Sequence, residues 1–463
     1  MKIEEFNEKK IYSEVSGVSS YLEPNIEIKM NKFGLYEETV VSTYKGKLNP
    51  KLEKVLPYLS KGLNEDDLSR SLYSYSEDIN YDKRLGYYKS LYVGHVLESD
   101  YRKNASSGGV GSWIFKELLE KKIIDGVIHV KENLDKTSEI LFKYSISRSV
   151  EEIRSGAKTR YYPVELSEVL NLIKNNEGKY ALIGIPSFIK AIRLLCLNDE
   201  IINERIVFTV GLICGHQKSS KFAEYMAWQV GIQPGKLKDI DFRYKLEGES
   251  ADSYAIKMSG LINGRIETII KPKNELDGQN WGLGYFKTFS SDFTDDVFNE
   301  TADLVIGDAW LPKYTNDHLG NNIIIARSDL ADSIIKEAIE TRKLNVDEVS
   351  TEVIFSSQAA HYRHTHDEIN YRLENQKKKG KWFPKTRVSE VKDRSYLRYK
   401  VQSYRMLISS QSHIYYEKAV ALDDIKYFEK KMKKMCTKYR YIYYVQAIKN
   451  KGIKGIFRKL LRR

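Results

Sequence analysis

Short apolar runs alternate with helical patterns from Tyr87 to about Ala326, and this alternation restricts the fold more than any other feature of the chain. The clearest unit begins with a strand-like run at residues 179–183, turns at residues 184–187 and continues into an amphipathic helix. A second strand follows at residues 205–214. A strand, a helix and a strand in this order are typical of parallel α/β layers. We therefore predict an α/β fold with a mostly parallel sheet and flanking helices.

Positive charge is concentrated at the C-terminal end. The chain has 75 Lys and Arg residues against 63 Asp and Glu residues, a net charge of +12. Residues 425–463 hold fourteen of these cations and one acidic residue, Glu429, so the tail carries +13 and the rest of the chain −1. Apolar residues such as Ile442 and Ile448 recur among the cations, which predicts a basic amphipathic helix. Two interpretations stay open, contact with a membrane surface or packing on the body or a partner. We expect no nucleic-acid binding, because no RNA-binding motif accompanies the charge.

The cysteines and the N-terminus indicate a cytoplasmic protein. Cys196, Cys214 and Cys436 lack paired spacing and are odd in number, which excludes a disulfide framework and a cysteine-built metal site. The first ten residues are too charged for a signal peptide, and no apolar run reaches the ~18 residues that a membrane span needs. We expect any membrane contact to be peripheral, at the inner face, through the tail.

Three turns join strand-like runs to helices and share a composition of small and polar residues. They contain Ser106, Ser107, Gly108 and Gly109 in the first turn, Gly184, Pro186 and Ser187 in the second, and Cys214, Gly215, His216 and Lys218 in the third. Small residues allow close backbone approach, and the free N–H groups at a helix start attract phosphate. If the strands are parallel, all three turns lie at one sheet edge, where α/β folds bind ligands. Together they favour a phosphate-bearing cofactor, although each turn alone is also a good helix cap and none has a known nucleotide fingerprint.

Several side chains near these turns have both a functional and a structural interpretation. His216 could donate a proton or simply bond to the backbone of its turn. Cys214 is more typical of a small core residue than of a nucleophile. Asp308 ends the strand at residues 304–307, a position that suits contact with cofactor or substrate. Three histidines near the end of the matched region, His361, His364 and His366, do not predict a metal site, because their spacing spreads the rings around a helix. We expect these side chains to be solvated or ion-paired.

Motifs in the same regions resemble a known family. The runs YVGH at residues 92–95, SSGGV at 106–110 and IDGVI at 124–128 resemble the N-terminal domain of the coenzyme F420 hydrogenase/dehydrogenase beta subunit. The C-terminal domain of that family is similar to YALIGIPSFIKAIRLL at residues 180–195, VGLICGHQKS at 210–219 and ADLVIGDAWLPKY at 302–314. The resemblance covers roughly residues 86–390. It implies a flavoprotein in which FAD passes electrons between an iron–sulfur cluster and a substrate.

The resemblance also implies a division of the chain and a set of cofactor contacts. The expected segments are a degenerate ferredoxin-like segment (1–85), the N-terminal family domain (86–165), the C-terminal α/β family domain (166–340), a helical accessory region (341–424) and the basic tail (425–463). FAD would be held by the first turn and neighbouring strand ends. Lys158, Thr159 and Arg160 correspond to a basic element of the family, and cations there would neutralise pyrophosphate; a solvated basic turn is the alternative.

The chain departs from the family at its metal ligands. Cysteines of the family correspond here to Ser187, Ser291 and Thr294, and Cys214 alone remains. A cysteine pattern of an N-terminal ferredoxin-like module corresponds to residues that carry no thiolate, Ser13, Ser16, Ser19 and Glu23. Iron–sulfur clusters need about four thiolates, and oxygen ligands are poor substitutes. We therefore expect no iron–sulfur cluster and no other metal.

Two hypotheses of different classes follow. The first is an FAD-dependent oxidoreductase that transfers hydride between a small-molecule electron donor and a substrate without iron–sulfur clusters, with His216 and Asp308 as candidate catalytic residues. The alternative is a redox-silent binding or assembly module associated with surface-polysaccharide biosynthesis. In that case the tail would dock the protein to a membrane surface or to a glycan-assembly enzyme. A partner protein would accordingly be a redox partner under the first hypothesis and a glycan-assembly partner under the second.

Overall fold

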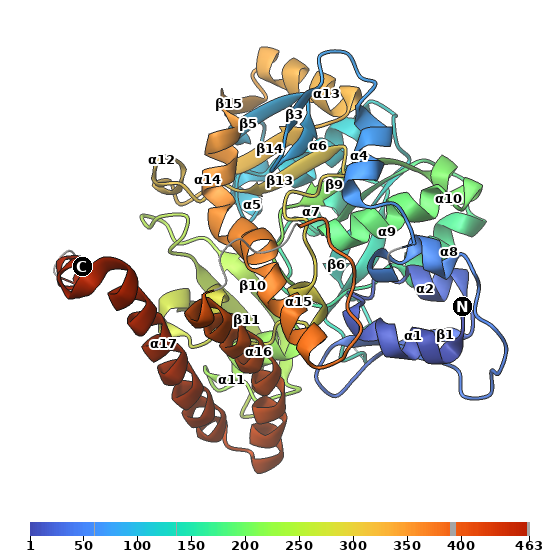
Figure 1. Cartoon of the computed structure of the whole chain (residues 1–463). Coiled ribbons are helices and arrows are strands. Elements are labelled where there is room, and N and C mark those ends of the chain that lie inside the picture. The colour runs from blue at the N-terminus through green and yellow to red at the C-terminus, as the bar shows by residue number, and fades with distance from the viewer. Residues whose placement is uncertain (60, 136, 389–394, 461–463) are drawn as a thin grey trace.

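The computed structural model describes residues 1–59, 61–135, 137–388 and 395–460, and its centre is an eight-stranded sheet (Figure 1). The strand order is β15-β5-β14-β13-β9-β8-β6-β7. In chain order these strands are β5 (Ser90–Val96), β6 (Gly126–Glu132), β7 (Phe142–Ser147), β8 (Tyr180–Gly184), β9 (Ile206–Leu212), β13 (Leu304–Asp308), β14 (Asn322–Ala326) and β15 (Leu344–Glu348).

Five of the eight strands run in the same direction. The neighbours β13, β9, β8 and β6 pair in parallel. β14 pairs antiparallel with both β13 and β5, so β5 points the same way as the central four. Only β7, β14 and β15 run the other way. The predicted α/β fold with a mostly parallel sheet is confirmed, and the carboxyl ends of β5, β8, β9 and β13 share one edge.

Helices cover both faces of this sheet. One face packs against α6 (Val110–Glu120) and α13 (Asp329–Glu340), whose apolar residues join Val210 and Ile306 in a buried cluster. The other face packs against α2 (Val18–Leu22), α8 (Ser167–Asn175), α9 (Pro186–Cys196), α10 (Glu200–Arg205) and α14 (Thr351–Tyr362). Hydrophobic burial on both faces explains why the central strands read as continuous apolar runs rather than alternating ones. Two short helices, α5 (Tyr101–Asn104) and α7 (Val150–Ser155), lie beside α6.

A second, smaller sheet lies beside the first and has its own core. Its strands β10 (Leu237–Tyr244), β11 (Ala255–Ile262) and β12 (Arg265–Pro272) are antiparallel. They pack with α11 (Ser220–Trp228), α16 (Tyr396–Leu422) and α17 (Ile425–Leu460) around an aromatic cluster in which Phe286 stacks on Phe428 at 5.6 Å.

The basic tail is helical, as predicted. α17 forms a hairpin with α16 and then projects from the body (Figure 1). Its first half buries Phe428, Met432, Cys436 and Tyr439, so this half packs on the protein. Ile448 is exposed. The side chains at 446, 447 and 449–460 and all of residues 461–463 lie outside the described structure, and the predicted membrane contact there stays a prediction. Within the part of the chain that is described, no helix has the length and hydropathy of a membrane span.

The N-terminal segment forms short helices and two β-hairpins. It contains α1 (Ile3–Lys9), α2, a hairpin of β1 (Ile26–Met30) and β2 (Tyr36–Val40), α3 (Leu52–Val55), α4 (Glu65–Tyr73) and a second hairpin of β3 (Asn80–Asp82) and β4 (Gly86–Tyr88). α3 ends before Pro57, because proline cannot continue the helix, and the chain forms a 3-10 turn instead. α4 starts with a capping box between Asn64 and Asp67.

The region after the sheet is mainly helical, as predicted, with one strand that the sequence did not reveal. β15 is charged, with the sequence Leu-Asn-Val-Asp-Glu, and pairs at the edge of the sheet, where charged side chains remain in solvent. After α14 the chain forms a π-helix (Arg363–Asp367), α15 (Ile369–Lys378) and α16. A further short helix, α12 (Pro312–Thr315), follows β13.

Candidate functional site

The three predicted turns follow β5, β8 and β9 and therefore lie at the same edge of the large sheet. Asn299 joins two of them, because its Nδ2 donates to the main-chain oxygens of Gly184 (3.0 Å) and Leu212 (3.3 Å). Pro186 is the first residue of α9, where a missing N–H is tolerated. The turns after β8 and β9 are thus neighbours, and the turn after β5 lies three strands farther along, beyond β13 and β14.

The turn at residues 106–109, named here the SSGG loop, packs tightly against the sheet. A Cβ atom on Gly108 would lie 2.7 Å from the main-chain oxygen of Gly94 and 2.8 Å from the nitrogen of Asn322. Gly109 has a φ of +90°, a conformation that favours glycine, and it begins α6. Both glycines are therefore required by the local backbone, whatever ligand the loop holds.

The two serines of the SSGG loop bind neighbouring segments. Ser106 Oγ accepts a hydrogen bond from the main-chain nitrogen of Thr159 at 2.9 Å. Ser107 Oγ donates to the main-chain oxygen of Asn321 at 2.9 Å. The structure thus brings the SSGG loop and the turn at residues 158–160 together, as the family resemblance implies.

A lysine that the sequence did not single out completes this region. Lys245 follows β10, and its Nζ donates to the main-chain oxygens of Arg102 (2.5 Å) and Ser107 (3.0 Å). Burial, with the nearby cations Lys158, Arg102 and Arg243, lowers the pKa of Lys245 to about 7. Its position could not be found from a motif, because only the tertiary fold brings β10 to this loop.

The other two residues of the predicted basic turn have different surroundings. Lys158 pairs with Asp241 at 2.9 Å and stays near the SSGG loop. Arg160 Nη1 donates to the main-chain oxygen of Ile240 (2.9 Å), and its guanidinium lies 4.3 Å from the ring centre of Phe142. Arg160 therefore binds the main chain of β10 and packs on an aromatic ring of β7.

Asp308, at the end of β13, is the partner of a buried arginine. Arg243 is 2% exposed, and its Nη1 donates to Asp308 Oδ2 at 2.8 Å. The guanidinium lies between the rings of Tyr254 (4.4 Å) and Trp310 (4.8 Å). In this arrangement Asp308 holds Arg243 in place, and the predicted catalytic role of Asp308 stays a prediction.

The turn after β9 places two basic side chains against one indole. Lys218 is 3% exposed, donates to the main-chain oxygen of Tyr285 at 2.6 Å and lies 4.8 Å from the ring centre of Trp281. Burial, followed by repulsion from Lys287, lowers the pKa of Lys218 to about 7. The ring of His216 lies 4.8 Å from that of Trp281, and burial holds its pKa well below the usual range. His216 is therefore a neutral hydrogen-bonding group near pH 7.

The four positions that correspond to cysteines in the C-terminal family domain are close together, and a carboxyl group lies among them. Ser291 Oγ donates to Glu14 Oε1, and Ser187 is beside the same carboxyl. Thr294 Oγ1 donates to the main-chain oxygen of Ser291 at 3.5 Å. Burial, with repulsion from Glu14, raises the pKa of Cys214 to about 12, so this residue is a thiol. One thiol among hydroxyls and a carboxyl does not fit an iron–sulfur cluster.

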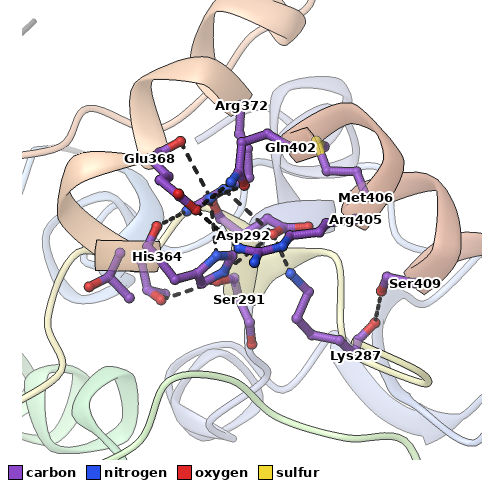
Figure 2. Close-up of polar contacts among 12 residues, drawn as sticks. Lys287, Ser291, Asp292, His364, Glu368, Arg372, Gln402, Arg405, Met406 and Ser409 are labelled. Carbon is purple, nitrogen blue, oxygen red and sulfur yellow. Dashed lines mark hydrogen bonds and ion pairs between the residues drawn. The ribbon is translucent and has the colours of Figure 1, made fainter. Parts of the chain in front are cut away.

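Beside these positions the structure contains a buried ionic cluster that the sequence did not reveal (Figure 2). Lys287 Nζ binds Asp292 Oδ1, and Arg372 Nε donates to the main-chain oxygen of Asp292 at 2.7 Å. His364 Nε2 lies 3.6 Å from Asp292 Oδ1, so this histidine belongs to the cluster and is not solvated. Gln402 connects Arg372 to α16, accepting from its Nη1 at 3.0 Å.

The other histidines of that predicted group are separate. The ring of His366 stacks on Tyr362 at 3.8 Å, and His361 Nδ1 contacts Gln358 Oε1 at 3.1 Å. Among the described residues no group of three or more His, Cys, Asp and Glu side chains is arranged to hold a metal ion.

Comparison with known proteins gives two adjacent family matches. Residues 91–171 match the N-terminal region of the coenzyme F420 hydrogenase/dehydrogenase beta subunit, and residues 177–352 match its C-terminal region. No curated protein matches the sequence. A chain of the F420-reducing NiFe hydrogenase complex from Methanosarcina barkeri is 18% identical, with a TM-score of 0.48 over 65% of this chain and 96% of that chain. On the two family matches, which follow each other along the chain in the family's own order, the protein belongs to the coenzyme F420 hydrogenase/dehydrogenase beta-subunit family, a family of oxidoreductases.

Proposed function

We propose that this protein is an FAD-dependent oxidoreductase that transfers hydride without iron–sulfur clusters. The observation that carries the proposal is a pair of lysines beside the carboxyl edge of the large sheet, the buried Lys218 and the half-buried Lys245. Each donates to main-chain oxygens rather than to a carboxylate, and burial lowers the pKa of each to about 7. Buried cations are costly unless an anion pairs with them, and a diphosphate is such an anion.

Buried nitrogen atoms without a hydrogen bond in the same region support a polar ligand. Arg243 Nε and His216 Nε2 are buried and form no hydrogen bond within the described structure. Most buried polar groups in proteins are hydrogen-bonded, so an unsatisfied one calls for a partner. The phosphate oxygens and ring nitrogens of FAD would supply acceptors of this kind.

The side chains suggest how the chain would hold this cofactor. Lys245 and Lys158, with the SSGG loop, would bind the diphosphate. Trp281 and Trp310 offer aromatic faces to a planar ring. Lys218 and His216 lie against Trp281 and would hold a proton near that ring. A bound flavin supplies two-electron hydride exchange with a small-molecule donor and a substrate.

The test is to purify the protein, record its visible spectrum and titrate the flavin-free form with FAD by fluorescence. We expect a flavin band, no iron, and at least tenfold weaker FAD binding for Lys245→Met. Lys238→Met is the matched control, because Lys238 is exposed on β10, the strand that leads to Lys245. A colourless protein that refuses added FAD, or equal FAD affinity in both variants, would contradict the proposal.

A second proposal is a redox-silent binding or assembly module associated with surface-polysaccharide synthesis, located in the cytoplasm and contacting a membrane or a partner protein through the tail. The observation in its favour is that a carboxyl group has replaced the sulfur atoms of the family at the centre of the molecule. The FAD titration separates the two proposals, because a redox-silent module has no need to bind FAD.

A further inference from the structure

Glu14 reaches from the N-terminal segment into the position that the family cysteines would surround. Its carboxyl accepts a hydrogen bond from Ser291, which in turn contacts Thr288 Oγ1 at 2.7 Å. The Glu14 main-chain oxygen lies 3.4 Å from Gln217 Nε2. The next residue, Val15, has a φ of +51°, a rare conformation for a β-branched residue. Such strain persists only where the surrounding structure enforces it, so the segment is held firmly in this place.

A second glutamate occupies an equivalent place in the ferredoxin-like segment. Glu38, on β2, is 2% exposed, and its Oε1 accepts a hydrogen bond from Ser19 Oγ. The hydroxyls of Ser13 and Tyr58 are beside the same carboxyl. Ser13 and Ser19 are two of the positions that correspond to cysteines in the ferredoxin-like module. A third such position, Glu23, binds the main-chain nitrogens of residues 25 and 49 instead.

The two carboxyls are alike in their electrostatics. Lys10 is the cation near Glu38, but it does not pair with the Glu38 carboxyl. Its Nζ donates to the Glu38 main-chain oxygen (2.6 Å) and pairs with the carboxylate of Glu37 (3.7 Å). Burial raises the pKa of both Glu14 and Glu38. Each carboxyl group is held by hydroxyl groups of the chain, an arrangement that needs no metal to be stable.

Cavities adjoin Glu14 on both sides. One of about 260 Å³ extends toward Glu38 and Gln217, and one of about 70 Å³ extends toward Ser187 and Thr294. Ser13, Glu14 and Val15 line both cavities. Removal of the Glu14 side chain would therefore enlarge the space among the four former cysteine positions.

We infer that Glu14 and Glu38 fill the two places where this family's pattern calls for iron–sulfur clusters, each as a hydrogen-bonded plug that excludes the metal. The serines at those places have a positive role in this arrangement, because they donate to or contact the carboxyls. The inference concerns the metal sites alone and stands whether or not the protein binds FAD.

The experiment restores the cysteines with and without the plug. The triple variant Ser187→Cys, Ser291→Cys and Thr294→Cys, which retains Cys214, is compared with the same variant carrying Glu14→Ala. Both are treated anaerobically with ferrous iron and sulfide, and iron is assayed. We expect cluster uptake only with Glu14→Ala, approaching the ~4 iron atoms per chain of a cubane cluster, and no iron in the untreated natural protein.

Three results would overturn the inference. These are equal iron uptake by the two cysteine variants, iron uptake by neither variant, and iron in the natural protein. A second measurement uses the natural cysteine set, so that it does not depend on the cysteine variants folding. Glu14→Gln retains a group that accepts the Ser291 hydrogen bond and should unfold at the same denaturant concentration as the natural protein. Glu14→Ala should unfold at a lower concentration, and equal midpoints for the two would contradict a plug.

Discussion

Replacement of Lys218 by Met should stabilise the flavin-free protein at low pH. Lys218 is 3% exposed and has no carboxylate partner within the described residues; it donates to one main-chain oxygen and lies over two aromatic rings. Methionine fills a similar volume without the charge. The charge of Lys218 thus opposes folding when no anion is bound, and its removal relieves that opposition.

The size of the effect follows from the pKa. Burial lowers the pKa of Lys218 from 10.5 to about 7, which at about 1.4 kcal/mol per pH unit corresponds to about 5 kcal/mol opposing the folded state. The lost hydrogen bond to Tyr285 and its unpaired oxygen offset about 1–3 kcal/mol of this. Lys218→Met should therefore raise the free energy of unfolding by about 2–4 kcal/mol at pH 6.

The sign of the pH dependence provides a second check. Between pH 7 and 10.5 the unfolded chain keeps the Lys218 proton while the folded chain has lost it, so the natural protein gains stability as pH rises. The advantage of Lys218→Met should therefore shrink by about 1.4 kcal/mol per pH unit above pH 7. Urea unfolding of flavin-free protein at pH 6 and pH 9, followed by tryptophan fluorescence, measures both quantities.

Lys238→Met serves as the control, since Lys238 is exposed and should leave the free energy of unfolding within about 0.5 kcal/mol at both pH values. A Lys218→Met variant that is less stable than the natural protein at pH 6 would refute the reasoning. So would a stability difference that stays constant from pH 6 to pH 9, because the lysine would then not titrate in that range.

Three further predictions address the ligand, the ionic cluster and the tail. Under the proposed function, the FAD affinity of the natural protein should fall as pH rises through about 7, because Lys245 and Lys218 lose the charge that would bind phosphate. Fluorescence titration should show that the affinity of Lys245→Met depends less on pH. An identical pH dependence in the two proteins would contradict the role of Lys245. Asp292→Asn should lower the free energy of unfolding by about 3–5 kcal/mol, because two buried cations lose their carboxylate. The control Asp329→Asn, at an exposed position, should lower it by about 1 kcal/mol or less. Similar losses in the two variants would contradict a stabilising role of the buried cluster. A chain that ends at Val445 removes seven cations and no acid while keeping the buried half of α17, so it should stay folded but lose flotation with anionic liposomes; unchanged flotation would refute membrane contact by the tail.

Local patterns in the sequence were sufficient to predict the large sheet. The run at residues 179–183, the turn with Pro186 and the second strand predict β8, α9 and β9 within a residue or two. Buried parallel strands are continuous apolar runs, so burial and sequence pattern coincide there. β15 lacks such a run because it is an edge strand, and its pairing with β5 depends on residues about 250 positions away.

Only part of the candidate site could be predicted from the sequence, because the other part depends on contacts between distant segments. Ser106 and Thr159, which the family resemblance assigned to one cofactor site, are in contact, because the main-chain nitrogen of Thr159 donates to Ser106 Oγ. Lys245, Glu14 and Asp292 belong to no motif that specifies a partner, and only the tertiary fold brings β10 to the SSGG loop or residue 14 to Ser291. A sequence shows which cysteines are absent, but it does not show which side chain fills the space that they left.

The side chains that fill the former metal sites limit the routes by which electrons could reach a bound flavin. A cluster carries single electrons between distant sites, whereas a carboxyl group held by serine hydroxyls, as at Glu14, has no accessible redox state. Under the proposed function, electrons could then neither enter nor leave through the interior of the protein. Donor and acceptor would both have to reach the flavin itself and exchange two electrons at a time. The region of Lys218, His216 and Trp281 would therefore serve two small molecules in turn.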